Sequence, residues 1–162
     1  MPELNPEGGL VIRHAYLWWT EARAGRDEGA KDRPCVIVHL RQNEYQETET
    51  FIAPITHTPP AIPEKALEIP QSTKKRLGLD KEPSWVITSE VNRFVWPGPD
   101  IRAVPGGALA YGHLPAAMTA DVIQQIRTNI RERSLLVLGR DDEMLNEKLR
   151  QSRKPKGKNQ RK

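Results

Sequence analysis

The sequence has only one cysteine, Cys35, among its 162 residues, which excludes an intramolecular disulfide and any metal site built from several cysteines. Because Cys35 lies inside an apolar run, we expect a buried structural thiol and not a nucleophile. No stretch approaches the roughly 20 apolar residues of a membrane-spanning helix. No apolar core follows the polar N-terminus, as a signal peptide would require. We therefore expect a cytoplasmic protein with no membrane partner.

Acidic residues are absent from the last part of the chain. Residues 150–162 contain seven of the 25 basic residues and no aspartate or glutamate, which leaves 18 basic against 21 acidic residues elsewhere. The net charge of +4 therefore belongs to the tail and not to the body. Two interpretations stay open: a solvated disordered terminus, or a tether that binds phosphates without sequence preference.

Internal repeats are also absent, and the length predicts one domain over residues 1–139 with a weakly helical extension and basic tail over 140–162. Short apolar runs rich in β-branched residues and bounded by turn formers indicate strands. The predicted strands are Leu10–Trp19, Cys35–Leu40, Phe51–Ile55, Ala66–Ile69, Ser84–Thr88, Glu90–Trp96 and Ile101–Val104. A long loop is expected over Glu21–Asp32, because this segment is charged and contains glycine.

Helical periodicity is confined to a few segments. The clearest begins near Thr119, where Val122, Ile123, Ile126 and Ile130 share one face. A weaker helix is expected over 141–151, and Ser72–Leu77 predicts one or two helical turns capped by Gly78. Many strands followed by helix indicate a mostly β fold with C-terminal α, either a small β-barrel or a strongly bent sheet.

Two short segments carry the chemistry. Arg33-Pro34 opens one predicted strand, and Thr56-His57 closes the next. If these strands are antiparallel neighbours, the start of the first lies beside the end of the second. Glu28 precedes Arg33 by five residues, so a carboxylate, a guanidinium, a hydroxyl and an imidazole would share one rim of the sheet. This set suits phosphoryl transfer.

The same residues resemble those of the MazF/PemK toxins of bacterial toxin–antitoxin pairs. The resemblance rests on a glycine-led strand ending in tryptophan, Glu28 before Arg33-Pro34 and an apolar strand, and the Pro54-x-Thr56 segment. It covers residues 8–133. The long connection over 58–83, the extension over 134–162 and His57 depart from the family pattern.

The resemblance implies an SH3-like β-barrel followed by C-terminal helices and a disordered basic tail. It implies a metal-independent, cofactor-free endoribonuclease that cuts single-stranded RNA, forms a homodimer and is regulated by an antitoxin protein. The family's active-site arginine and threonine fall on Arg33 and Thr56, and its loop glutamate falls on Glu28. Arg93, Asn92, Arg26 and Lys31 are the candidate RNA-binding residues.

Metal-free RNA cleavage uses the 2′-hydroxyl as nucleophile and gives a 2′,3′-cyclic phosphate and a 5′-hydroxyl. Arg33 suits the phosphate, because its planar fork binds two oxygens and stays charged. His57 is a candidate for proton transfer. Strand neighbours point to opposite faces, so Thr56 and His57 share a site only if the strand ends or bulges there. Glu28 serves either as base or to orient Arg33.

Ordinary structural roles are the alternative to catalytic or RNA-binding roles for several of these residues. Arg33 is otherwise an ordinary arginine at a strand start, and the four tryptophans serve either as core residues or as stacking platforms for bases. The spacing of the four histidines predicts no metal site. The alternative function is a non-catalytic SH3-like module that binds nucleic acid or protein.

Overall fold

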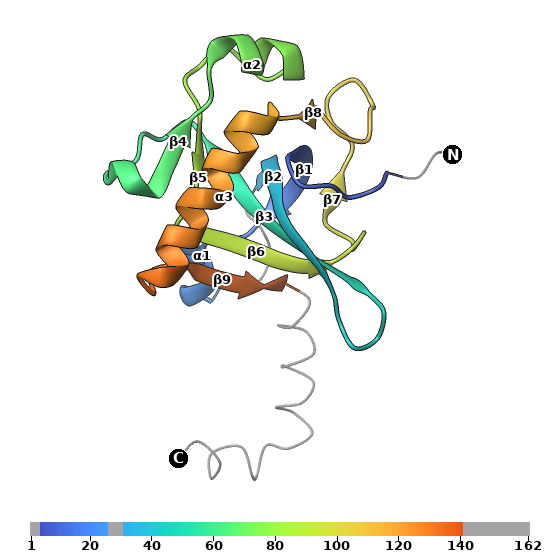
Figure 1. Ribbon diagram of the computed structural model, residues 1–162. Helices are drawn as coiled ribbons and strands as arrows, with labels where there is room; N and C mark the ends of the chain where they lie inside the picture. The colour runs from blue at the N-terminus through green and yellow to red at the C-terminus, as the bar shows by residue number, and fades with distance from the viewer. Residues whose placement is uncertain (1–3, 26–30, 141–162) are drawn as a thin grey trace.

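The computed structural model describes residues 4–25 and 31–140 of the chain (Figure 1). Arg26 and Glu28, the helix expected over 141–151 and the basic tail lie outside these described residues. The strands are β1 (Leu10–Tyr16), β2 (Lys31–Gln42), β3 (Thr48–Thr56), β4 (Ala66–Glu68), β5 (Trp85–Ile87), β6 (Glu90–Val95), β7 (Ile101–Arg102), β8 (Gly112–His113) and β9 (Leu136–Gly139). The helices are α1 (Trp19–Arg23), α2 (Gln71–Leu77) and α3 (Ala116–Arg131), with a 3₁₀ turn at Pro63–Lys65.

The strands of the described part form one mostly antiparallel sheet of nine strands. Its main path runs β4-β5-β3-β2-β1-β7, while β6 pairs with β3, β8 with β1, and β9 with β6. The sheet is open, so the expected closed barrel is wrong in this respect. Closure would require hydrogen bonds between the outer strands β4 and β7, and these two strands do not pair. The mostly β fold with a C-terminal helix is confirmed.

Both faces of the central strands are buried, which explains the continuous apolar run in β2. Successive side chains of a strand point to opposite faces. Val36 and Val38 accordingly join one core cluster, whereas Cys35 and Ile37 join the other. The Cys35 thiol is fully buried, as expected, and burial raises its pKa well above the usual range.

Helix α3 covers the first of these two faces (Figure 1). Val122 and Ile126 of the predicted apolar stripe are buried in the same cluster as Val11, Val36 and Leu77, and Ile123 packs against it, whereas Ile130 is 54% exposed. The short helix α2 ends at Gly78, whose φ of 76° is the left-handed cap expected from the sequence.

Three local features differ from the sequence expectations. Strand β1 ends at Tyr16 and not at Trp19, because the Leu17 backbone bonds to a side chain instead of a strand. The expected loop begins with helix α1, which the Glu21 carboxylate caps by accepting from the Trp18 amide at 3.1 Å. The short strands β8 and β9 were not expected, and each forms only by pairing with a distant strand.

A candidate phosphate pocket at the ends of two strands

A pocket of about 380 Å³ opens where β2 begins and β3 ends. It is lined by Lys31, Asp32, Arg33, Pro34, Ile55, Thr56, His57, Thr58, Leu79, Asp80 and Ser84. Arg33, Thr56, His57 and Lys31 are therefore brought together as the sequence suggested. We call this feature the Arg33 pocket.

The antiparallel register between β2 and β3 explains the convergence. Cys35 pairs with Pro54 across the two strands. Continuing this register by two residues sets Arg33 beside Thr56. Because β3 ends at Thr56, His57 is freed from strand alternation and lines the same pocket. Thr56 and His57 can therefore share a site, because the strand ends between them.

Arg33 lies over an aromatic ring, and one of its nitrogens has no hydrogen-bond partner among the described residues. Its guanidinium carbon lies 5.0 Å from the ring centroid of Trp18, a cation–π geometry. Its Nε atom is buried and has no hydrogen-bond partner within the described residues. The planar fork of Arg33 is thus oriented by Trp18 and can receive an anion.

Trp18 is in turn fixed by strand β6. The Asn92 side chain accepts from the Leu17 amide at 3.0 Å and donates to the Leu17 carbonyl at 2.9 Å. The Glu90 carboxylate accepts from the Trp19 amide and from the Tyr16 hydroxyl, each at 3.0 Å. These bonds hold the backbone on both sides of Trp18, and so hold the surface on which Arg33 rests.

This arrangement corrects the expected role of Asn92. Its side chain is fully buried, and both ends of its amide are used by the Leu17 backbone. A direct RNA contact by Asn92 is therefore wrong, and its role is to shape the support for Arg33. Burial raises the pKa of the neighbouring Glu90 carboxyl, although the bonds from Trp19 and Tyr16 oppose this shift.

The other expected RNA-binding residues are placed differently from one another. Lys31 is exposed and lines the Arg33 pocket. Arg93 pairs in register with Phe51 on the β3 side and does not line that pocket. For Arg26 and for the candidate base Glu28, the described residues give no position.

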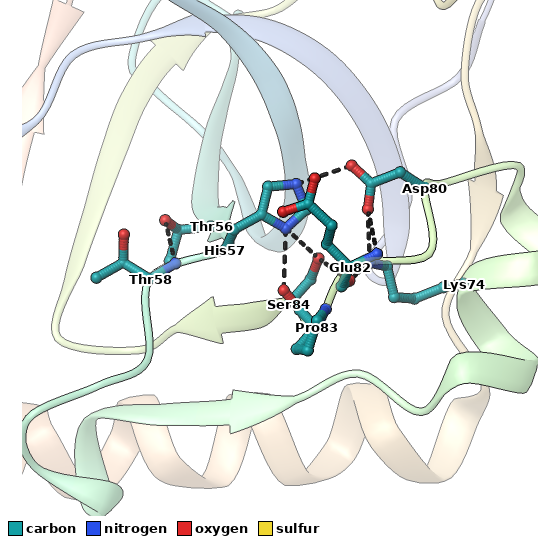
Figure 2. Close-up of polar contacts among 8 residues, drawn as sticks. All are labelled: Thr56, His57, Thr58, Lys74, Asp80, Glu82, Pro83 and Ser84. Carbon is teal, nitrogen blue, oxygen red and sulfur yellow. Dashed lines mark hydrogen bonds and ion pairs between the residues drawn. The ribbon is translucent and has the colours of Figure 1, made fainter.

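The His57 side chain has three polar partners at the pocket, namely Asp80, Pro83 and Ser84 (Figure 2). Its Nε2 atom lies 2.8 Å from Asp80 Oδ2, and its Nδ1 atom lies 2.9 Å from the Pro83 carbonyl oxygen. The Thr56 hydroxyl accepts from the Thr58 amide at 3.2 Å, which leaves the Thr56 hydroxyl hydrogen available to a ligand.

Sequence reasoning missed Asp80 and Lys74. Lys74 lies three residues before Leu77 on the buried face of α2, and its side chain is only 1% exposed. Its ammonium donates to Asp80 Oδ1 at 2.9 Å. That helical spacing is the one sequence signal for a buried Lys74. No signal could have paired Asp80 with His57, because their contact depends on the fold of residues 58–79.

Metal binding and serine nucleophilic catalysis both use side chains of these kinds. His57, Asp80 and Glu82 hold ligand atoms within 4.8 Å of one another, a group that could accept a metal ion. However, both Asp80 oxygens already bind side chains of the protein, Lys74 and His57. Ser84 lies 3.1 Å from His57 Nδ1, as a serine nucleophile would, but it is only 2% exposed and offers a substrate no approach.

Across the described residues, none of the helices combines the length and apolar character needed to cross a membrane. No protein-family model matches the chain, and no curated protein matches it either. The geometry of the Arg33 pocket therefore carries the functional argument.

Proposed function

We propose that this protein is a metal-independent endoribonuclease of the MazF/PemK type, which cleaves single-stranded RNA by attack of the 2′-hydroxyl on the adjacent phosphate. One observation carries the proposal: Arg33, Thr56 and His57, selected from the sequence for phosphoryl transfer, line one pocket. Lys31 adds a second fixed positive charge at its edge.

In the proposed reaction, the RNA phosphate enters between Arg33 and Thr56. The Arg33 fork binds two non-bridging oxygens, and its charge offsets the negative charge that develops on the phosphorane. The Thr56 hydroxyl donates a hydrogen bond to the same phosphate. These contacts strengthen as the phosphorane forms, which is the requirement for lowering the barrier.

The proposed reaction moves two protons. The 2′-oxygen loses its proton to a base, for which the resemblance offers Glu28, and bonds to phosphorus. The bond between phosphorus and the 5′-oxygen breaks, and His57 supplies the proton that the leaving oxygen needs. The products are a 2′,3′-cyclic phosphate and a 5′-hydroxyl. The partners implied by the same resemblance, an antitoxin and a second copy of the chain, are part of this proposal.

The test is incubation of the purified protein with a long single-stranded RNA in EDTA, with the 5′ ends of the fragments mapped. Discrete cuts bearing 5′-hydroxyl ends are expected. Arg33→Ala is expected to lower the single-turnover rate by about 10²–10³-fold, as for other preorganised donors to a developing anion.

Arg41→Ala is the matched control, because Arg41 also lies on β2, also lies over an aromatic ring, and lies outside the pocket. Its rate is expected to stay within about twofold, the ordinary range for a surface substitution. Intact RNA with a folded protein would contradict the nuclease. Retained RNA binding without cuts would favour the non-catalytic binding module.

A further inference from the structure

A row of four side chains crosses the sheet beside the Arg33 pocket. Strand β5 lies between β4 and β3 (Figure 1). Trp85 of β5 pairs in register with Thr56 of β3 on one side and with Glu68 of β4 on the other. The register of β2 and β3, continued by two residues, sets Arg33 beside Thr56. The order across four strands is therefore Arg33, Thr56, Trp85 and Glu68.

These four side chains share the face of the sheet that points away from α3. Directly paired residues of antiparallel strands place their side chains on the same face, with Cβ atoms about 4.5–5.5 Å apart. The next pair along β3 and β5 points the other way, because Ile55 and Val86 are buried in the cluster that α3 covers. Trp85 therefore lies one strand beyond Thr56, on the face that carries Arg33.

The indole of Trp85 is placed differently from two other tryptophans of the chain. Trp18 and Trp96 pack against one core cluster, whereas Trp85 is only partly buried and belongs to neither cluster of the described residues. An indole at the surface beside a phosphate site is a platform on which an unpaired base can stack.

Glu68, the last member of the row, is exposed. Its carboxylate pairs with no cation in the part of the chain that the structure describes. An ionised carboxylate only accepts hydrogen bonds, so Glu68 can bind a donor group on the edge of a base that rests on Trp85.

We propose that Trp85 and Glu68 form a base-binding subsite next to the phosphate held by Arg33 and Thr56. The base stacks on the Trp85 indole, and Glu68 accepts a hydrogen bond from its exocyclic amino group. The proposal rests on the proposed ribonuclease function, since the same pocket places the RNA. It narrows the substrate to single-stranded RNA whose base at this position bears an amino group, which cytosine, adenine and guanine carry and uracil lacks.

Cytosine and uracil differ at this edge in a way that a carboxylate can distinguish. Cytosine presents an amino group at position 4, whereas uracil presents a carbonyl oxygen there. The Glu68 carboxylate accepts from the amino group but has no hydrogen to offer the carbonyl oxygen. Stacking tolerates every base, because every base has a π-face. Trp85 therefore supplies affinity, and Glu68 supplies the preference.

The experiment measures the binding of two heptamers of 2′-O-methyl RNA, one of cytidine and one of uridine, to the full chain by fluorescence anisotropy. A methylated 2′-oxygen cannot act as the nucleophile, so binding is measured without cleavage. The wild type is expected to bind the cytidine heptamer at least about fivefold more tightly, the lower end of the range for a specific base contact. Thermal melts confirm that each variant is folded.

Trp85→Leu is expected to weaken the binding of both heptamers by at least about fivefold, because it removes the stacking surface. Trp85→Phe keeps an aromatic ring and should stay within about threefold of the wild type. Tyr45→Leu is the matched control, since Tyr45 is an exposed aromatic residue in the turn between β2 and β3, at the other end of these strands. Its affinity should stay within about twofold. Equal affinities of Trp85→Leu and Tyr45→Leu would overturn the stacking platform.

Glu68→Ala is expected to bring the affinities for the two heptamers within about twofold of each other. Its matched control is Glu64→Ala, because Glu64 is another exposed carboxylate, on the 3₁₀ turn that precedes β4. Both variants lose one negative charge and gain general affinity for phosphates. Only Glu64→Ala should keep the preference for cytidine. A preference that survives Glu68→Ala would overturn the role of Glu68.

The subsite and the nuclease fail in different ways. If unmodified RNA is cut but heptamer binding depends on neither Trp85 nor Glu68, the subsite is overturned and the nuclease stands. If the heptamers bind with both dependences but unmodified RNA stays intact, the nuclease is overturned and the subsite belongs to a non-catalytic RNA-binding module. If neither heptamer binds, the subsite is overturned, because stacking does not require a particular sequence.

Discussion

Two arginines on the same strand, Arg33 and Arg41, lie in very different surroundings. Each guanidinium lies over an aromatic ring, at 5.0 Å from Trp18 and 5.2 Å from Phe51 respectively. Arg41 is also bound to the Glu49 carboxylate at 2.6 Å, whereas no carboxylate among the described residues pairs with Arg33. The guanidinium of Arg41 is therefore partly neutralised, whereas Arg33 has no carboxylate partner within residues 4–25 and 31–140.

The cavities around these arginines differ in the same way. Arg41 lies at a groove of about 800 Å³ between α3 and the sheet, which we call the Arg41 groove. Aliphatic side chains of this groove include Ile126, Ile130, Val91 and Val137. The Arg33 pocket is smaller and adds a hydroxyl and an imidazole beside the guanidinium. An arginine becomes a candidate for phosphate chemistry through free hydrogen bonds and nearby proton donors, and not through its charge alone.

The histidines that line these two cavities offer the largest expected contrast between them. His57 lines the Arg33 pocket, and His39 lines the Arg41 groove. His57→Ala is expected to lower RNA cleavage by about 10²-fold or more, the usual range for an acid–base residue. His39→Ala should leave the rate within about twofold. A loss below about threefold for His57→Ala in single-turnover assays would remove His57 from the mechanism.

Substitutions near the two cavities should lower the stability of the protein by different amounts. Asn92→Ala would leave the buried Leu17 amide and carbonyl without partners, beneath Trp18 and Arg33. We expect a loss of about 2–6 kcal/mol in the free energy of unfolding, because each of the two orphaned buried groups costs about 1–3 kcal/mol. Ile130→Ala, on the wall of the Arg41 groove, should cost less than about 1 kcal/mol, because Ile130 is 54% exposed.

Urea unfolding measures both free energies. Equal losses for the two variants would contradict the proposed difference between a buried polar support and an open apolar wall.

The pH dependence of folding stability gives a further contrast, because a buried histidine lies beside Arg33. His14 pairs in register with Arg33, is fully buried and packs against Phe94 with ring centroids 4.5 Å apart. Burial, with the charges of Arg140 and Arg102, lowers its pKa from 6.5 to about 3. The unfolded chain therefore binds more protons than the folded chain between these values, and stability falls as the pH falls below 6.5.

The expected loss from His14 approaches about 1.4 kcal/mol for each pH unit below 6.5. Unfolding of wild type and His14→Leu, measured at pH 7 and pH 5, should show this acid loss greatly reduced in the variant. His39→Leu, at the exposed histidine of the Arg41 groove, should keep the loss of the wild type. An unchanged acid loss in His14→Leu would contradict the buried neutral histidine.

Several parts of the fold and site follow from local pattern. The apolar runs predicted β2, β3, β5 and β6 to within a few residues, and the 3.6-residue periodicity predicted the packed face of α3 except at Ile130, which is exposed. The convergence of Arg33 with Thr56 followed from assuming that two successive strands are antiparallel neighbours. These features depend on residues close in sequence or on the shortest possible strand connection.

Other features were decided by contacts between distant segments. The Asp80–His57 and Asn92–Leu17 contacts join residues 23 and 75 positions apart. Strand β9 exists through its parallel pairing with β6, and the open edge of the sheet depends on where β4 and β7 finally lie. No periodicity or motif encodes such pairings.

The sequence by itself determined the main apolar strands, the main helix and the residue types at the ends of β2 and β3, because backbone preference and apolar alternation act locally. Only the tertiary structure decided that the sheet stays open, that Asn92 supports Trp18, and that Lys74 and Asp80 stand behind His57. Buried polar groups must find partners wherever the folded chain brings them. Which partner each buried polar group finds is therefore decided by the tertiary structure.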